Sequence, residues 1–78
     1  MLNLKIESPF LIDAFDDMIM AIVERKKFHE YHVSYVTWLN GLRRYVVDFN
    51  SENGDTIFTG TIDIWQENEK TYVEFEEL

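Results

Sequence analysis

The chain has 78 residues, with 15 Asp and Glu against 7 Lys and Arg, a net charge of −8 and no cysteine. This length predicts one domain over residues 1–78, and an apolar content of 46% is too high for a disordered chain. The acidity argues against direct binding to nucleic acid or to an anionic membrane, which both need clustered bases. Without cysteine, and without a secretion signal in the first residues, we expect a cytoplasmic protein.

The first third of the chain has the pattern of a strand followed by a helix. Residues 2–7 alternate apolar and polar side chains, as a half-buried strand does. Ser8 and Pro9 then favour a helix start, with the serine as N-cap and the proline at the first helical position. From Pro9 to Lys27 the polar side chains fall mainly within one arc, which predicts an amphipathic helix.

The rest of the chain predicts strands joined by turns. Asn40-Gly41 separates two runs of β-branched and aromatic residues, and this dipeptide is preferred in two-residue hairpin turns. Such a turn places Leu39 opposite Leu42. Further strands are expected at residues 56–65 and 70–76, because turn-forming residues precede each of them.

Matching the apolar faces of these strands gives an expected register. It puts Val47 opposite Phe58, Tyr45 opposite Gly60, and Ile62 opposite Val73. The predicted fold class is therefore α+β in the order β-α-β-β-β-β. One helix packs on one face of a mainly antiparallel sheet of four to five strands, and the first strand is placed at either edge.

One helix covers only one face of a sheet, so the two faces should differ. The expected core face holds Val36, Trp38, Tyr45, Val47, Phe49, Phe58, Ile62, Ile64, Val73 and Phe75. The opposite face is apolar and aromatic near the first hairpin and acidic at the last strand. An uncovered apolar surface of this kind is typical of an interaction site.

These features favour a non-enzymatic, acidic protein-binding module that docks a basic partner. It would be an inhibitor of the immunity type, or one encoded by a phage or mobile element, that imitates the charge of a nucleic acid. The contact residues are expected on the exposed sheet face and the acidic last hairpin: Tyr35, Val46, Asp63, Trp65, Glu67, Glu69, Tyr72, Glu74 and Glu76. Aromatic residues among them would be anchors, and the carboxylates would steer the partner.

Two alternatives remain open at this stage. The apolar end of the same face, with Tyr31, Val33, Tyr35 and Val46, or an open strand edge, could close a homodimer with a structural or assembly role. His29 and His32 could serve a small-ligand or metal sensor, although no third ligand is obvious in the sequence. No catalytic motif is found, and no cofactor or catalytic residue is expected.

Overall fold

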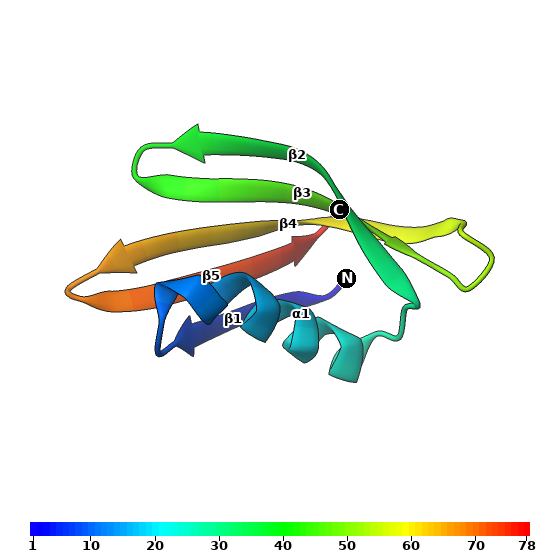
Figure 1. Cartoon of the computed structure of the whole chain (residues 1–78), viewed down its shortest axis with the longest axis horizontal. Coiled ribbons are helices and arrows are strands. Elements are labelled where there is room, and N and C mark those ends of the chain that lie inside the picture. The colour runs from blue at the N-terminus through cyan, green and yellow to red at the C-terminus, as the bar shows by residue number, and fades with distance from the viewer.

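The computed structural model describes all 78 residues and contains one helical layer on one five-stranded sheet (Figure 1). The elements are β1 (Asn3–Ser8), a 3₁₀ turn η1 (Leu11–Asp13), α1 (Ala14–Arg25), β2 (Glu30–Leu39), β3 (Leu42–Asn50), β4 (Thr56–Glu67) and β5 (Lys70–Glu77). The strand order is β1-β5-β4-β3-β2, and every neighbouring pair is antiparallel. The α+β class is confirmed, and the first strand lies at the β5 edge of the sheet.

The helix begins later than its sequence pattern indicates. Ser8 is the last residue of β1, where it lies opposite Thr71, so it is not the N-cap of α1. Its hydroxyl instead donates to the carboxylate of Asp17, at 2.6 Å between Oγ and Oδ2. Ser8, the predicted N-cap, therefore links β1 to the first turn of α1 through its side chain. Pro9 lies between β1 and the helix, before the first helical residue.

Both tight hairpins have two-residue turns with positive φ. Asn40 and Gly41 have φ of 43° and 87°, and Leu39 lies opposite Leu42, which confirms the predicted first hairpin. The last hairpin also turns in two residues, because Asn68 and Glu69 have φ of 52° and 64°. Positive φ is uncommon for glutamate, so the sequence gives no signal for a turn this short.

The predicted registers of the two later strand pairs are wrong by two residues. Val47 lies opposite Gly60 rather than Phe58, and Ile62 lies opposite Phe75 rather than Val73. The short turn at Asn68 accounts for the second shift, since β4 continues to Glu67. The first follows from pairing Phe49 with Phe58, whose rings stack at 4.5 Å between centroids.

A bulge in β2 reverses the predicted side of two residues. The pairing with β3 shifts by one residue between Val33 and Tyr35, which leaves Ser34 without an opposite residue. Val33 then packs against the core cluster, and the Tyr31 ring lies 5.8 Å from that of Phe15 on the helix. Neither residue is on the face where the alternating pattern predicts it, because a one-residue shift exchanges the two faces.

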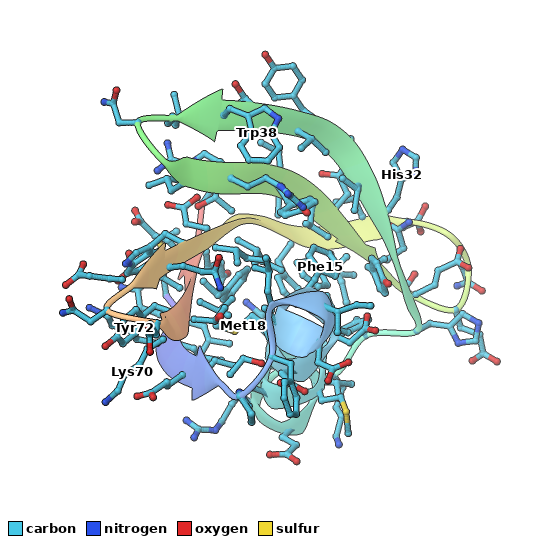
Figure 2. All side chains as sticks on the ribbon, turned by 60° about the vertical axis from the view of Figure 1, so that its left-hand side comes forward. Phe15, Met18, His32, Trp38, Lys70 and Tyr72 are labelled. Atoms are coloured by element: carbon cyan, nitrogen blue, oxygen red, sulfur yellow. The ribbon has the colours of Figure 1, made fainter.

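The core lies between α1 and the sheet, and its buried apolar residues on the sheet come from β3, β4 and β5. The helix contributes Ala14, Met18 and Ile22, which repeat every four residues and are fully buried. Figure 2 shows Phe15 and Met18 on the side of the helix that faces the sheet. The sheet contributes seven buried apolar residues, Val47, Phe49, Phe58, Ile62, Ile64, Val73 and Phe75.

Two predicted core residues are exposed instead. Val36 is 45% and Trp38 is 68% accessible, although both lie on the same side of the sheet as the helix. The reason is the position of α1, which packs on β5, β1 and β4 and leaves the tip of the β2–β3 hairpin uncovered. The ring of Trp38 stacks on the guanidinium of Arg43, 4.3 Å from its centroid, and borders a surface hollow with Leu11.

Gly60 is required by the close approach of Phe75. A Cβ at residue 60 would lie 2.3 Å from Cε1 of Phe75 and 2.8 Å from the carbonyl oxygen of Glu76. The sequence pattern predicts an aromatic cover for this strand glycine, but assigns it to Tyr45. Phe75 occupies that place, since it lies opposite Ile62 on the neighbouring strand.

We therefore expect Gly60→Ala to lower the free energy of unfolding by about 1–3 kcal/mol, the usual range for an overpacked core. Urea denaturation measures the change. Phe75→Leu removes the ring atoms that a Cβ would meet, so the double variant should be more stable than the sum of the two single effects predicts. Additive effects would show that the Phe75 ring is not the obstacle.

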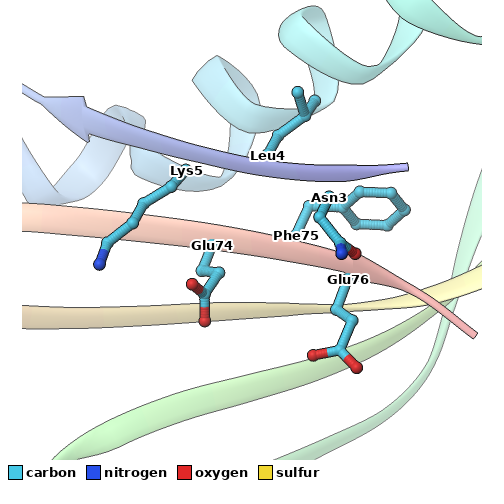
Figure 3. Close-up of a pocket in the computed structure, with 6 residues that line it drawn as sticks. All are labelled: Asn3, Leu4, Lys5, Glu74, Phe75 and Glu76. Atoms are coloured by element: carbon cyan, nitrogen blue, oxygen red, sulfur yellow. The ribbon is translucent and has the colours of Figure 1, made fainter. Parts of the chain in front are cut away.

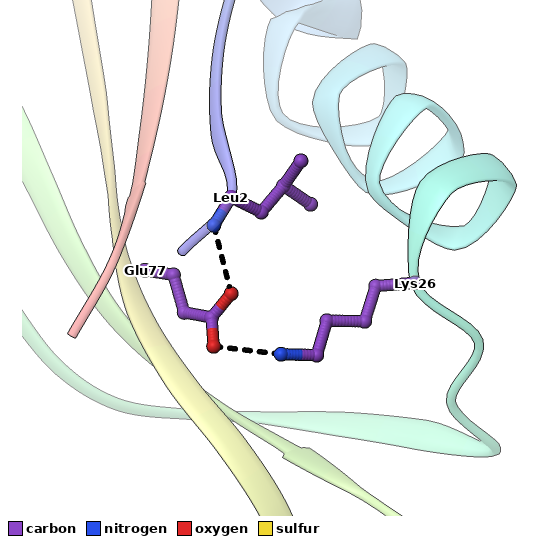
Figure 4. A network of polar contacts seen from close by, with 3 residues as sticks. All are labelled: Leu2, Lys26 and Glu77. Atoms are coloured by element: carbon purple, nitrogen blue, oxygen red, sulfur yellow. Dashed lines mark hydrogen bonds and ion pairs between the residues drawn. The ribbon is translucent and has the colours of Figure 1, made fainter.

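Glu77 connects the two ends of the chain to the end of the helix (Figure 4). Its carboxylate accepts from Nζ of Lys26 at 2.7 Å and from the backbone N–H of Leu2 at 3.0 Å. The hydrogen bond from Lys26, followed by that from Leu2, lowers the pKa of Glu77 below its ordinary value. The backbone N–H of Glu77 in turn donates to the carbonyl oxygen of Leu2, at 3.0 Å.

Because folding lowers this pKa, the ionised Glu77 stabilises the folded state at pH values above 4.5, the ordinary pKa of the group. This stabilisation is lost as the pH falls through the lowered pKa of the folded state. Glu77→Gln should reduce stability at pH 7 and leave less stability to lose between pH 5 and pH 2. Urea denaturation across this range tests the sign. Glu52→Gln, in the exposed β3–β4 loop, is the control that should leave the curve unchanged.

Candidate functional site

The sheet surface opposite α1, called the outer face here, carries no second layer. Antiparallel pairing arranges its side chains in three rows that run from β2 across to β1. The rows are Tyr35, Val46, Thr61, Glu76 and Asn3; then Thr37, Arg44, Asp63, Glu74 and Lys5; then Leu39, Leu42, Trp65, Tyr72 and Glu7. The β2–β3 end of the face is rich in apolar side chains, and the β5 end is rich in carboxylates.

The outer face collects most of the predicted contact residues. Tyr35, Val46, Asp63, Trp65, Tyr72, Glu74 and Glu76 all belong to its rows, and Glu67 continues the same side of β4. Glu69 lies in the turn between β4 and β5. Tyr31 and Val33 do not belong to the face, because the bulge at Ser34 turns them toward the helix. The apolar patch expected for a face-to-face homodimer is therefore smaller than predicted.

An ion pair occupies the centre of the outer face. The guanidinium of Arg44 donates from Nε and Nη2 to the two carboxylate oxygens of Asp63, both at 2.8 Å. Asp63 is only 8% exposed, whereas 39% of the Arg44 side chain is exposed. The hydrogen bond to Asp63 and the charge of that carboxylate raise the pKa of Arg44 above its ordinary value. Asp63, predicted to steer a partner, is thus neutralised within the sheet.

Two aromatic rings lie beside this ion pair. Trp65 and Tyr72 are opposite each other on β4 and β5, and their rings stack at 5.8 Å with an angle of 27° between planes. Nζ of Lys5 lies 5.7 Å from the centroid of the Trp65 ring. Stacking holds the two rings in fixed positions, so they present an ordered aromatic surface.

Glu74 and Glu76, together with Asp48 and Glu67, provide the unpaired negative charge of the face. None of these carboxylates is in an ion pair, since the three salt bridges of the protein are Lys26–Glu77, Arg44–Asp63 and Lys70–Glu7. Figure 3 shows the side chains of Glu74 and Glu76 pointing away from the helix, on the same side as Lys5, with Leu4 pointing toward it. They border a surface hollow between β1 and β5, and Glu74 borders a second one beside Trp65.

The histidines do not form part of a metal centre. No group of three His, Asp or Glu side chains is arranged to hold a metal ion. His32 lies opposite Asp48 on β2 and β3, while His29 precedes β2 and donates its backbone N–H to Asn50 at 2.8 Å. Residues three apart on an extended chain point in different directions, which separates the two imidazoles.

The only α-helix, α1, has 12 residues, and no helix of the structure is long and apolar enough to cross a membrane. Comparison of the chain with protein-family models, curated proteins and solved structures finds no match. What the protein can do is therefore inferred from the outer face itself. Its apolar, aromatic and carboxylate groups lie on a firmly paired sheet and are suited to contact with another macromolecule.

Removal of the cation and removal of the carboxylate of the Arg44–Asp63 ion pair should lower stability by different amounts. We expect Arg44→Met to lower the free energy of unfolding at pH 7 by about 1–2 kcal/mol, less than for a fully buried pair because Arg44 is partly hydrated. Asp63→Asn should cost less, since the guanidinium left behind can turn to water. In Arg44→Met the largely buried carboxylate of Asp63 is left without its cation, which is why this variant should carry the larger deficit. Equal deficits in both variants, measured by urea denaturation, would contradict this account.

Proposed function

We propose that the protein is a non-enzymatic binding module that docks a partner with a basic surface through its outer face. The observation that supports this proposal is the composition of that uncovered face. It combines apolar and aromatic side chains with carboxylates, among them Glu74 and Glu76, that form no salt bridge within the chain. A monomer gains nothing from leaving such a surface in water, whereas a partner can cover it.

The apolar part of the face supplies the contact area. Tyr35 is 61% exposed, and Leu39 also remains accessible at the same end of the sheet. Trp65 and Tyr72 extend the aromatic surface toward β5. Tyr and Trp are enriched among the residues that carry most of the binding energy in interfaces, because they bury a large area with little loss of side-chain freedom.

The charged part of the face supplies selectivity for a basic partner. Glu74 and Glu76 lie two residues apart on β5, and Glu67 follows on the same side of β4. Carboxylates at the rim of an interface attract a basic surface, raise the rate of encounter and disfavour acidic partners. The net charge of −8 acts in the same direction at longer range.

An inhibitor of a nucleic-acid-binding protein fits this chemistry. A basic groove that holds phosphates would meet a row of carboxylates beside aromatic rings, which imitate charge and base stacking together. Immunity proteins and inhibitors encoded by phages or mobile elements are typical settings for such charge imitation, and the proposed role is of that class. The proposal assigns the docking residues to Tyr35, Val46, Trp65, Glu67, Glu69, Tyr72, Glu74 and Glu76, with Asp63 holding Arg44.

Charge reversal tests the proposal in a quantitative pull-down from the cells that make the protein. The face variant is Glu74→Lys with Glu76→Lys, and the control is Glu52→Lys with Asp55→Lys, which makes the same charge change in the β3–β4 loop. We expect a captured basic protein whose yield falls about tenfold with the face variant and falls again at high salt. Capture that is equal for all three baits, or insensitive to salt, would refute the proposal.

A further inference from the structure

The two edges of the sheet differ in how well they are protected against pairing with another strand. β1 is a short edge of six residues that carries Lys5 and Glu7, and Pro9 follows it. Charged side chains, short length and proline are the features by which edge strands avoid intermolecular pairing. β2 is the opposite edge, with ten residues, and it lies free at the margin of the sheet (Figure 1).

β2 lacks these protections over nearly its whole length. Residues 31–39 contain no Asp, Glu, Lys, Arg or Pro. After the bulge at Ser34, residues 35–39 pair regularly with β3, so the backbone N–H and C=O groups on their other side form an ordered, unpaired row. Val36 and Trp38 are exposed on the helix side of this segment, and Tyr35 and Leu39 on the outer face.

The charge distribution indicates which partner this edge fits. A second copy also carries a charge of −8, so two copies repel wherever their carboxylates meet. Antiparallel pairing of residues 35–39 with the same residues of the second copy brings together two segments without carboxylates, and it is self-complementary, as a twofold interface requires. A basic partner is attracted less to residues 35–39 than to β5, because residues 35–39 carry no charge and Glu74 and Glu76 lie on β5.

We propose that two copies of this chain associate by antiparallel pairing of their β2 edges into one continuous sheet. The twofold axis is then perpendicular to the sheet, so both helices lie on the same side and the two outer faces adjoin. Tyr35 and Leu39 of one copy approach those of the other across the seam. On the helix side, Val36 and Trp38 gain cross-strand neighbours that the monomer does not provide.

Sedimentation velocity from about 1 µM to several hundred micromolar tests the proposal on the full chain. The wild type should sediment as a dimer at the higher concentrations. Val36→Lys places a charge at the seam in each copy and should raise the dissociation constant at least about tenfold. The control is Ile57→Lys, because Ile57 is 48% exposed, close to the 45% of Val36, and lies at the start of β4 outside the edge.

Hydrogen exchange supplies a second measurement that needs no variant. Amides of residues 35–39 should exchange more slowly at dimeric concentration than at high dilution, whereas those of β1 should not change. A wild type that stays monomeric at several hundred micromolar, equal dissociation constants for the two lysine variants, or unchanged exchange in β2 would each overturn the proposal.

Salt separates this proposal from the binding function. Screening reduces the repulsion between two acidic chains, so the dimer should be as strong or stronger at high salt, while docking of a basic partner weakens. Val36→Lys should leave capture of the basic protein near the wild-type level, and the double reversal of Glu74 and Glu76 should leave the dimer intact. Either proposal can therefore fail while the other stands.

Discussion

A helix of 12 residues is about 18 Å long, whereas the molecule extends 41 Å in its longest dimension. α1 therefore covers β1, β5 and β4, reaches Tyr45 and Tyr31 only through Phe15, and leaves the rest of the sheet without a layer. The ten buried apolar residues come from the helix and from β3, β4 and β5, where they lie beneath the helix. The exposed hairpin tip, the uncovered outer face and the open β2 edge are all consequences of this limited cover.

The prediction of the outer face succeeded although two registers were wrong. Both errors are shifts of two residues, and side chains of a strand alternate with a period of two, so every residue stayed on its predicted face. The bulge at Ser34 adds a single residue instead, which turned Tyr31 and Val33 to the other side. The apolar positions do change phase here, from Tyr31 and Val33 to Val36 and Trp38, but Tyr35 is also apolar and conceals the change.

The ion pair between Arg44 and Asp63 could not be predicted because the expected register between β3 and β4 was wrong. The expected register places Arg44 opposite Thr61, but the observed one places it opposite Asp63. A carboxylate assigned to steering is thus bound within the sheet, and the sequence alone could not separate it from Glu74 and Glu76. Composition predicts how much negative charge the chain carries, whereas cross-strand pairing decides how much of it a partner meets.

The separation of charge from the open edge links the two proposals. Adjacent strands lie about 4.8 Å apart, so in a dimer paired through β2 the two β5 strands are about 34 Å from each other. This distance is several Debye lengths at physiological salt, and the two rows of carboxylates hardly repel. The joined outer face then has an uncharged, aromatic seam between two acidic margins. An acidic chain can associate with itself in this way because residues 35–39 carry no charge and because Glu74 and Glu76 lie three strands from the edge that pairs.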